Sequence, residues 1–436
     1  MGPLDPWPAI SLNPSRSGTV AAVSAAATPH DAAAAAASSA AVAAAAPSPA
    51  SHPSPVPLAG PSSPVSPAGE ATPGGVALLD SLDRYAEAVR EYYEPTMRER
   101  VRQAIPPAVL SAAIGEGADT NTSPAVDGAP AAAGDEDPAA AADGDAACSV
   151  PFLSDASRPP VPTFTAAAAP CDLATCPDAR LTRALLTWFK DDFFTWIDTL
   201  PCGTCGGPTT VTDTVGPSDD ERAGRASRVE LHECSACGTV ARFARFAHPL
   251  KLLSTRRGRC GEWAQAFTAV AVAAGLTARL IVDSTDHLWT EVWSHTARRW
   301  VHADACEAAL DTPLLYEAGW GKRLAYILAA GEGVADVTRR YTGRYAELAA
   351  RRTVVGEAWL AASLARRNAT ALAALPQGAV RDAAAARGVA DWEALHGGGV
   401  GTGAPPIGDG GEGVRLPGRQ SGAADWVRER GENGGG

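Results

Sequence analysis

The sequence of 436 residues predicts an α+β fold. Apolar residues recur at the spacing of an amphipathic helix in the segments 78–101 and 181–196. Three short apolar runs with strand character follow at 278–282, 287–293 and 298–304. The last two are separated by a four-residue loop, so we expect them to form an antiparallel hairpin. Helices together with an antiparallel sheet indicate the α+β class.

The composition limits the class of protein. The chain has 37 Lys and Arg against 49 Asp and Glu, a formal net charge of −12, which argues against a nucleic-acid partner or a polybasic membrane binder. No stretch approaches the roughly 18 consecutive apolar residues of a transmembrane helix. The chain shows no secretory signal, and its nine cysteines include two Cys-x-x-Cys pairs, which suits a reducing compartment. We therefore expect a cytoplasmic or nuclear protein without a membrane span.

Low-complexity stretches divide the chain into segments. Its 43 glycines and 35 prolines exceed ordinary usage, and Ala, Pro and Ser dominate the first 77 residues. Such segments bury too little apolar surface to offset the entropy lost on ordering. The expected units are a disordered arm (1–77), a helical segment that packs on the core (78–111), a low-complexity insert (112–169), the core (170–345), C-terminal helices (346–396) and a Gly-rich tail (397–436).

Four cysteines have the spacing of a metal site. Cys202 and Cys205 form one Cys-x-x-Cys pair, Cys234 and Cys237 form the other, and each pair is followed by a glycine that allows a tight turn. Two such turns supply four thiolates for one tetrahedral zinc ion. Four thiolates leave no open coordination position, so the ion would stabilise the fold and would not catalyse. A redox Cys-x-x-Cys pair is the alternative, although a redox site needs only one pair.

A further cysteine, Cys260, lies where a helix is expected to begin. The segment 258–267, GRCGEWAQAF, opens a helix that Gly275 would end. The positive end of the helix dipole and three neighbouring arginines favour the thiolate form of this cysteine. A buried, inert cysteine is the alternative. The position at a helix start favours a nucleophile.

The hairpin predicts partners for this thiol. If the loop 294–297 joins the two strands, Trp293 pairs with Arg298, and the same register places His287 directly opposite Asp304. A carboxylate beside a histidine fixes its tautomer and supports the imidazolium, which in turn activates a thiolate. The three side chains therefore form a predicted Cys-His-Asp triad.

Other residues compete for these roles or surround them. His302 lies on the same face as Asp304, but the predicted register pairs it with Trp289, and Cys306 follows a strand without a helix dipole. Several tryptophans and carboxylates near the triad suit sugar stacking and polar contacts, with core packing or a solvated surface as the alternative. The candidate substrate contacts are Trp196, Trp263, Glu291, Trp293 and Glu307.

Several motifs occur in a fixed order over residues 181–345: LTWFKDDFFTWID, the two Cys-x-x-Cys pairs, TRRGRCGEW, DSTDHLWTEVW, RRWVHADACE and LLYEAGWGKRLAYI. This succession closely resembles the cytoplasmic peptide:N-glycanases, a family of the transglutaminase-like superfamily. The tail motif LPGRQSG with Trp426 resembles the C-terminal region of plant-type members. The resemblance implies a transglutaminase-like (papain-like) core with a helix-borne Cys, an antiparallel sheet that carries His and Asp, and a zinc subdomain with four cysteine ligands.

The resemblance also implies an activity. Members of the family are peptide-N4-(N-acetyl-beta-glucosaminyl)asparagine amidases, which remove N-glycans from misfolded glycoproteins in ER-associated degradation and convert Asn to Asp through a thioester. By matching motifs, Cys260 would be the nucleophile, His287 the base and Asp304 its orienting partner. One structural zinc ion is the implied cofactor. Denatured N-glycoproteins are the implied substrates, and ubiquitin-receptor shuttle proteins linked to the proteasome are the implied partners.

Two positions depart from the family pattern. Gln265 stands where Asn is usual in the GEWAN motif, and His248 stands where Asn usually precedes the proline. Two alternative functions use the same fold: a transglutaminase or thiol protease with the same triad, and a catalytically silent module that binds DNA. The intact triad and the negative net charge argue against the DNA-binding module.

Overall fold

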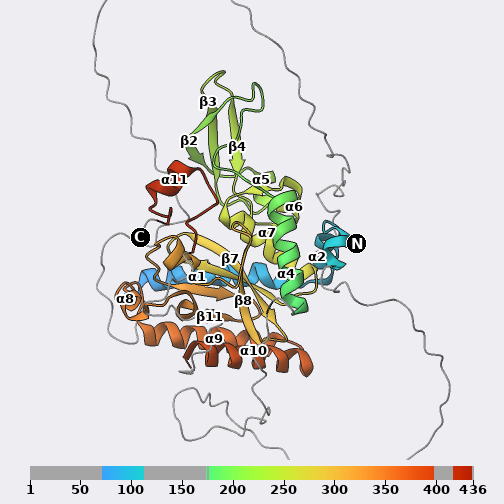
Figure 1. Ribbon diagram of the computed structural model, residues 1–436, viewed down its shortest axis with the longest axis vertical. Helices are drawn as coiled ribbons and strands as arrows, with labels where there is room; N and C mark the ends of the chain where they lie inside the picture. Colours follow the sequence, from blue (N-terminus) through green and yellow to red (C-terminus); the bar gives the residue numbers. More distant parts are fainter. Residues whose placement is uncertain (1–70, 112–172, 174–175, 397–415, 435–436) are drawn as a thin grey trace, which may run out of the picture.

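The computed structural model describes residues 71–111, 173, 176–396 and 416–434. Most of the predicted arm, the insert 112–169 and the first part of the predicted tail lie outside these residues. The centre of the fold is a six-stranded antiparallel sheet with helices on both faces (Figure 1). Its strands, in spatial order, are β11 (Val334–Asp336), β10 (Ile327–Ala330), β6 (Ala278–Asp283), β7 (His287–Ser294), β8 (Arg299–Asp304) and β9 (Ala309–Leu310).

The predicted hairpin forms, but its register differs from the expected one by two residues. Trp293 pairs with Trp300 and not with Arg298, because the turn occupies residues 295–298. Side chains alternate between the two faces of a strand with a period of two, so a slip of two keeps each on its expected face. His287 and Asp304 therefore still share a face, although they are not directly opposite each other.

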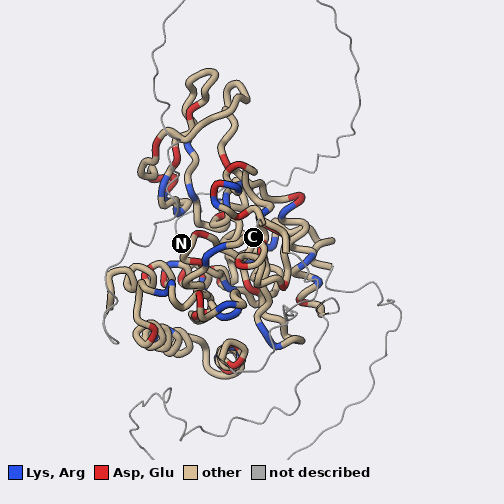
Figure 2. The backbone as a smooth tube through the Cα atoms, turned by 60° about the vertical axis from the view of Figure 1, so that its left-hand side comes forward, with Lys and Arg blue, Asp and Glu red and all other residues tan. Residues whose placement is uncertain are grey.

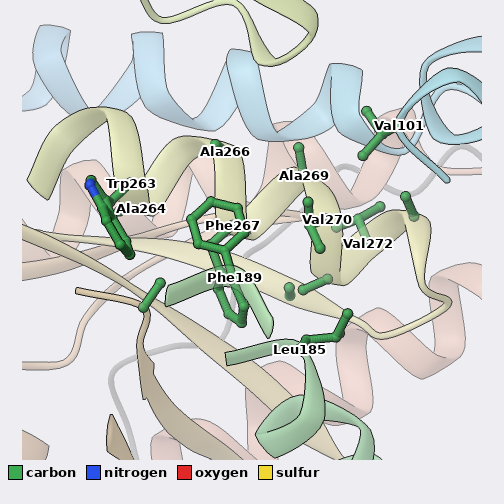
Figure 3. Close-up of a cluster of buried hydrophobic side chains, with 14 of the residues drawn as sticks. Val101, Leu185, Phe189, Trp263, Ala264, Ala266, Phe267, Ala269, Val270 and Val272 are labelled. Carbon is green, nitrogen blue, oxygen red and sulfur yellow. The ribbon is translucent and has the colours of Figure 1, made fainter. Parts of the chain in front are cut away.

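One face of the sheet is covered by helices that lie early in the chain. α7 (Cys260–Ala273) is buried along almost its whole length against β7, and Gly275 follows it with φ +99°. Figure 3 shows Phe267 of this helix beside Phe189, with 5.5 Å between the ring centroids. The other helices around this core are α1 (Pro73–Tyr92), α2 (Pro95–Arg102), α3 (Pro107–Ser111), α4 (Pro177–Trp188) and α6 (Pro249–Thr255).

Two of these helices differ from the expected segments. The first begins at Pro73, before the expected Leu78, because Thr72 caps it by accepting a hydrogen bond from the Gly75 N–H at 3.0 Å. It ends at Tyr92, and a separate helix starts at Pro95, since proline has no N–H to continue the first one. The helix expected to reach Trp196 changes at residue 189 into a π-helical turn, η1 (Phe189–Phe193), and is followed by β1 (Thr195–Trp196).

The opposite face of the sheet packs against segments that lie later in the chain. Trp289 and Ile327 contact a cluster that includes Tyr316, Trp320 and Tyr341, all fully buried. Helices α9 and α10 lie along the side of the sheet that is lowest in Figure 1. The elements of this layer are η2 (Leu315–Gly319), η3 (Thr338–Tyr341), α8 (Tyr345–Ala349), α9 (Glu357–Ala374) and α10 (Ala379–His396).

A small three-stranded sheet projects from the body at the top of Figure 1. It consists of β2 (Thr209–Val215), β3 (Val229–Cys234) and β4 (Val240–Ala244), with α5 (Asp219–Ala223) beside it. A parallel bridge of β1 with β5 (Arg257–Gly258) lies between this sheet and the body. Acidic and basic residues are interspersed on both the projecting sheet and the body (Figure 2). No helix of the described residues is long and apolar enough to cross a membrane.

Candidate active site

The local sequence around Cys260 fixes the start of α7 at this residue. A Cβ atom at Gly258 would lie 2.3 Å from the Cβ of Glu262, so only glycine fits there. The Glu262 carboxylate accepts a hydrogen bond from the Arg259 N–H at 3.0 Å and one from the Arg245 Nε at 2.7 Å. These hydrogen bonds fix Glu262 in the first turn of α7. The Cys260 thiol lies at the N-terminus of α7, which is the positive end of the helix dipole.

His287 and Asp304 form the second part of the predicted triad. Nε2 of His287 lies 2.8 Å from Oδ2 of Asp304, and both side chains are buried. Oδ2 also accepts a hydrogen bond from the Tyr316 hydroxyl at 2.9 Å, and Oδ1 accepts one from the Cys306 N–H at 2.8 Å. Nδ1 of His287 has no hydrogen-bond partner among the described residues, so this nitrogen is free to face the Cys260 thiol.

The charges of this group favour a thiolate and an imidazolium. Burial disfavours both charged forms, but His287 outweighs burial at Cys260 and lowers the pKa of the thiol. Burial also opposes the charge on His287, whereas the Asp304 carboxylate and the Cys260 thiol raise the pKa of the imidazole to about 9. His287 in turn lowers the pKa of Asp304 against the effect of burial. Between the pKa values of Cys260 and His287, the thiolate–imidazolium pair is the expected state.

Aromatic rings surround the histidine, and sequence reasoning did not single out two of them, Tyr316 and Trp320. The Trp320 ring lies 4.9 Å from the His287 ring between centroids, and Trp289 lies 5.7 Å away on another side. Tyr316 bonds both to Asp304 and, at 2.7 Å, to Nε2 of His302. The motif LLYEAGWGK carries two of these residues, but its spacing alone does not show that it folds over the hairpin.

The two competing residues lie in inert surroundings. His302 bonds to Tyr316 on one nitrogen and accepts the Thr312 N–H at 3.3 Å on the other. Burial lowers the pKa of His302 to about 4, so the ring is neutral near pH 7. Burial raises the pKa of the Cys306 thiol well above its usual range, which leaves this cysteine protonated.

A cavity of about 480 Å³ is lined by Cys306, whose N–H binds Asp304, but by none of the three triad residues. Two of the candidate substrate contacts, Trp196 and Trp263, line it together with Cys306. The Trp263 Nε1 is buried and has no hydrogen-bond partner among the described residues. The remaining lining residues come from segments 190–198 and 420–422.

The other candidate contacts do not line this cavity. Glu291 is fully buried and its carboxylate is bound by Arg279 at 2.7 Å and Arg340 at 2.8 Å, so it is neither a solvated group nor a cleft group. Trp293 packs against Trp300, with 5.6 Å between the ring centroids. Glu307 bonds to backbone N–H groups of segment 416–434. The expectation that these three contact substrate directly is therefore not supported by their positions.

The four predicted metal ligands lie together at the end of the projecting sheet that points away from the body (Figure 1), where Cys234 ends β3 and pairs with Thr209. The Sγ atoms of Cys202 and Cys237 are 3.5 Å apart, as are those of Cys205 and Cys234. Zinc–sulfur bonds of about 2.3 Å place the sulfurs of a tetrahedral site about 3.8 Å apart, so the spacing fits a metal ion. Gly206 and Gly238, at φ +72° and +69°, make the tight turns that aim the sulfurs inward. The cluster can thus hold a metal ion.

Comparisons with known proteins agree with this arrangement. The model of the transglutaminase-like superfamily matches residues 209–305, and the model of the Rad4 transglutaminase-like domain matches residues 282–383. A solved structure, described as "Crystal structure of Rad4-Rad23 bound to a 6-4 photoproduct UV lesion", covers 76% of this chain and 58% of its own, with a TM-score of 0.38 and 14% identity. That score is too low to support an argument.

Curated relatives are more similar. Proteins named peptide-N(4)-(N-acetyl-beta-glucosaminyl)asparagine amidase are 50% identical over 178 residues in Gallus gallus and 44% identical over 177 residues in Arabidopsis thaliana, each over 40% of this chain. The Caenorhabditis briggsae protein of this name is 39% identical over 264 residues, or 59% of the chain. These matches span 27%, 24% and 42% of the three relatives. The core of this chain is therefore similar to the transglutaminase-like superfamily and, within it, to the peptide-N(4)-(N-acetyl-beta-glucosaminyl)asparagine amidases.

Proposed function

We propose that this protein is a deglycosylating amidase that cleaves the bond between an N-glycan and its asparagine. One observation carries the proposal: Cys260 lies at a helix start, and its thiol interacts with the buried His287, which is hydrogen-bonded to Asp304, in a core similar to that of named amidases. The relatives' name supplies the substrate class. The chain spans about a quarter of the first relatives' length, so the activity of the whole protein is part of the proposal.

The first half of the proposed reaction forms a thioester. The Cys260 thiolate attacks the side-chain amide carbon of the glycosylated asparagine and forms a carbon–sulfur bond. The carbon–nitrogen bond then breaks, and the His287 imidazolium donates its proton to the leaving nitrogen, which departs as a glycosylamine. Asp304 keeps the imidazole in the tautomer that this transfer needs. Backbone N–H groups at the start of α7 are positioned to bind the oxyanion.

The second half restores the enzyme. Neutral His287 takes a proton from water, the resulting hydroxide attacks the thioester carbonyl, and the carbon–sulfur bond breaks to return the thiolate. The asparagine has become an aspartate, and the glycosylamine decays in water to the free glycan and ammonia. Trp196 and Trp263 line the cavity of about 480 Å³ and are the proposed contacts for the sugar, since indole rings stack on sugar faces.

The finer parts of the proposal concern the metal and the setting. We propose that the ion held by the four cysteines is a single zinc ion, because an all-thiolate tetrahedral site is typical of structural zinc. It stabilises the projecting sheet and takes no part in the reaction. Misfolded N-glycoproteins in the cytoplasm or nucleus, within ER-associated degradation, are the proposed substrates. Ubiquitin-receptor shuttle proteins are the proposed partners, a proposal that the family resemblance alone supports.

A mass measurement tests the activity. The zinc-loaded protein is incubated in heavy-oxygen water with a heat-denatured high-mannose glycoprotein, beside a Cys260→Ala control. We expect loss of the whole glycan and an aspartate that carries one heavy oxygen, with neither change in the control. Incorporation of an amine into glutamine side chains, without glycan release, would instead identify a transglutaminase. Well-folded protein with neither activity would refute the proposal.

A further inference from the structure

The segment 416–434 lies against the candidate active site, although it is distant from the triad in the sequence. The Glu307 carboxylate accepts hydrogen bonds from the N–H groups of Gln420, at 2.9 Å, and Ser421, at 3.1 Å. The residues 420–422 line the same cavity as Trp196 and Trp263. Helix α11 (Ala424–Glu429) of this segment, red in Figure 1, lies between the projecting sheet and the body. The segment thus forms one wall of the proposed substrate cavity.

This wall carries a buried cation next to the catalytic histidine. The Arg419 guanidinium lies over the rings of Trp320, at 4.7 Å, and Trp426, at 4.6 Å. Trp320 also contacts His287, so only one indole separates the cation from the proposed base. Glu432 binds the Arg419 Nη1 at 2.7 Å, whereas Nη2 is buried without a hydrogen-bond partner among the described residues. Glu432 also pairs with Arg430 at 3.0 Å, so the two arginines share this carboxylate.

A second arginine of the same segment, Arg430, binds the carboxylate of Asp286. Nη1 of Arg430 donates a hydrogen bond to Oδ2 of Asp286 at 3.1 Å. Asp286 directly precedes His287 and has a left-handed backbone with φ 79°. Its negative charge opposes a thiolate at Cys260. The ion pair with Arg430 reduces this opposition.

The other charged groups near Cys260 come from four further elements. His287 and Arg419 favour the thiolate, and Asp286 opposes it. Arg245, directly after β4, also interacts favourably with a thiolate. Tyr85 of α1 and Cys306 after β8 would each add a negative charge only when ionised, and their pKa values are raised. Near neutral pH, segment 416–434 therefore supplies one of the positive groups around the thiol and neutralises its negative neighbour.

We propose that segment 416–434 is a positioning element of the active site: Arg419 is a fixed cation beside Cys260, Arg430 neutralises Asp286, and together they maintain the nucleophile as a thiolate. The proposal rests on the proposed role of Cys260 as nucleophile. It assigns Arg419 and Arg430 no contact with the reacting atoms. Both act through the charge state of the thiol.

The rate at which iodoacetamide alkylates Cys260 in the full chain tests this role. The reagent is neutral, so its reaction rate follows the thiolate fraction, and mass analysis of the Cys260 peptide separates this thiol from the others. For Arg419→Gln, we expect the pH midpoint of alkylation to rise by about one unit, which is about tenfold slower alkylation below the midpoint. Arg430→Gln shifts the midpoint less in the same direction. Arg419→Lys keeps the charge and most of the rate.

The control is Arg428→Gln. Arg428 lies on α11, is largely exposed and pairs with Asp425 at 2.8 Å, so its removal leaves the midpoint unchanged. If Arg419→Gln is too unstable to use, Arg430→Gln alone decides the question. A midpoint equal to that of the control would overturn the proposal, and so would faster alkylation at every pH, which would identify the segment as a cover. No glycan enters this assay, so its failure is distinct from failure of the amidase.

Discussion

Arg259 donates two hydrogen bonds to Glu230, at 3.0 and 2.7 Å, and thereby ties the projecting sheet to the residue that precedes Cys260. Glu230 belongs to β3, which ends at the predicted metal ligand Cys234, and its side chain is fully buried. Arg245 shares the same carboxylate and also binds Glu262 at the start of α7. The metal module and the nucleophile are therefore joined by a short chain of buried ion pairs.

Glu230→Gln is expected to slow the enzyme without releasing the metal. The substitution removes the negative partner of two buried arginines, and an uncompensated buried charge is destabilising by about 3–5 kcal/mol. Urea unfolding followed beside glycan release would measure both effects. The exposed Glu233→Gln on the same strand is the matched control, and equal losses in the two variants would contradict this link.

We expect Cys202 to be needed for stability and Cys260 to be needed for activity. Cys202→Ala removes one of four sulfurs that are within 4.8 Å of one another, so metal binding and the projecting sheet are expected to be lost. Cys260→Ala removes a half-buried thiol and should leave the melting temperature nearly unchanged while abolishing activity. Metal content and thermal unfolding of both variants give the answer. A similar loss of folded protein in both would remove the distinction.

Glycan release should depend on pH on both sides of neutrality. The thiolate of Cys260 is lost as the pH falls through its lowered pKa, and the imidazolium of His287 is lost as the pH rises through about 9. The pKa of His287 is higher in the folded state, at about 9, than in the unfolded state, at about 6.5. The positive charge on His287 therefore stabilises the fold fully below about pH 6.5, and this stabilisation is lost as the pH rises through about 9. A pH profile of kcat/KM measures the two limits. A rate that keeps rising above pH 9 would exclude the ion-pair state.

Tyr316→Phe should lower both activity and stability. The hydroxyl bonds to both Asp304 and His302, and a hydrogen bond to a charged group contributes about 1.5–3 kcal/mol. Without it, we expect glycan release to fall about tenfold as Asp304 loses one of its partners. The kinetics of the variant decide this. Tyr345→Phe, whose ring lies at 3.7 Å from the Arg339 guanidinium, should not affect the rate.

Asp391→Ala should destabilise the protein without changing its chemistry. Asp391 of α10 binds Arg279 at 2.7 Å and also pairs with Arg340, and both arginines also hold Glu291. Its loss leaves two buried cations with one carboxylate, a cost of about 3–5 kcal/mol. Chemical denaturation would show this change. A stable variant with impaired catalysis would instead place the cluster in the active site.

The sequence predicted the parts of the site that local rules determine. Cys260 at a helix start follows from helix capping, and the shared face of His287 and Asp304 follows from the period of a strand, so it survives an error of two in the register. The register itself depends on the turn at 295–298. Arg298 in this turn has a left-handed backbone conformation, which the residue type does not predict.

The parts that sequence reasoning missed depend on contacts between distant segments. The strand pattern around Glu291 is also that of a surface or cleft carboxylate. Its burial is explained only by its ion pair with Arg340 and by the packing of α10, which are contacts between distant segments. Arg419 stands in a Gly-rich tail with no periodic pattern, and its position among three tryptophans comes from tertiary packing. Neither relationship leaves a local signal in the sequence.

The neighbouring positions of α3 and α4 have a consequence for how the chain tolerates insertions. α3 ends at Ser111 and α4 begins at Pro177, yet the two helices contact each other, so the ends of the intervening segment are close in space. The entropy of closing a loop grows only with the logarithm of its length, about 0.6 kcal/mol for each doubling. By this relation, doubling or halving the length of the connection changes the loop-closure part of the folding free energy by only about 0.6 kcal/mol while the two helices remain packed.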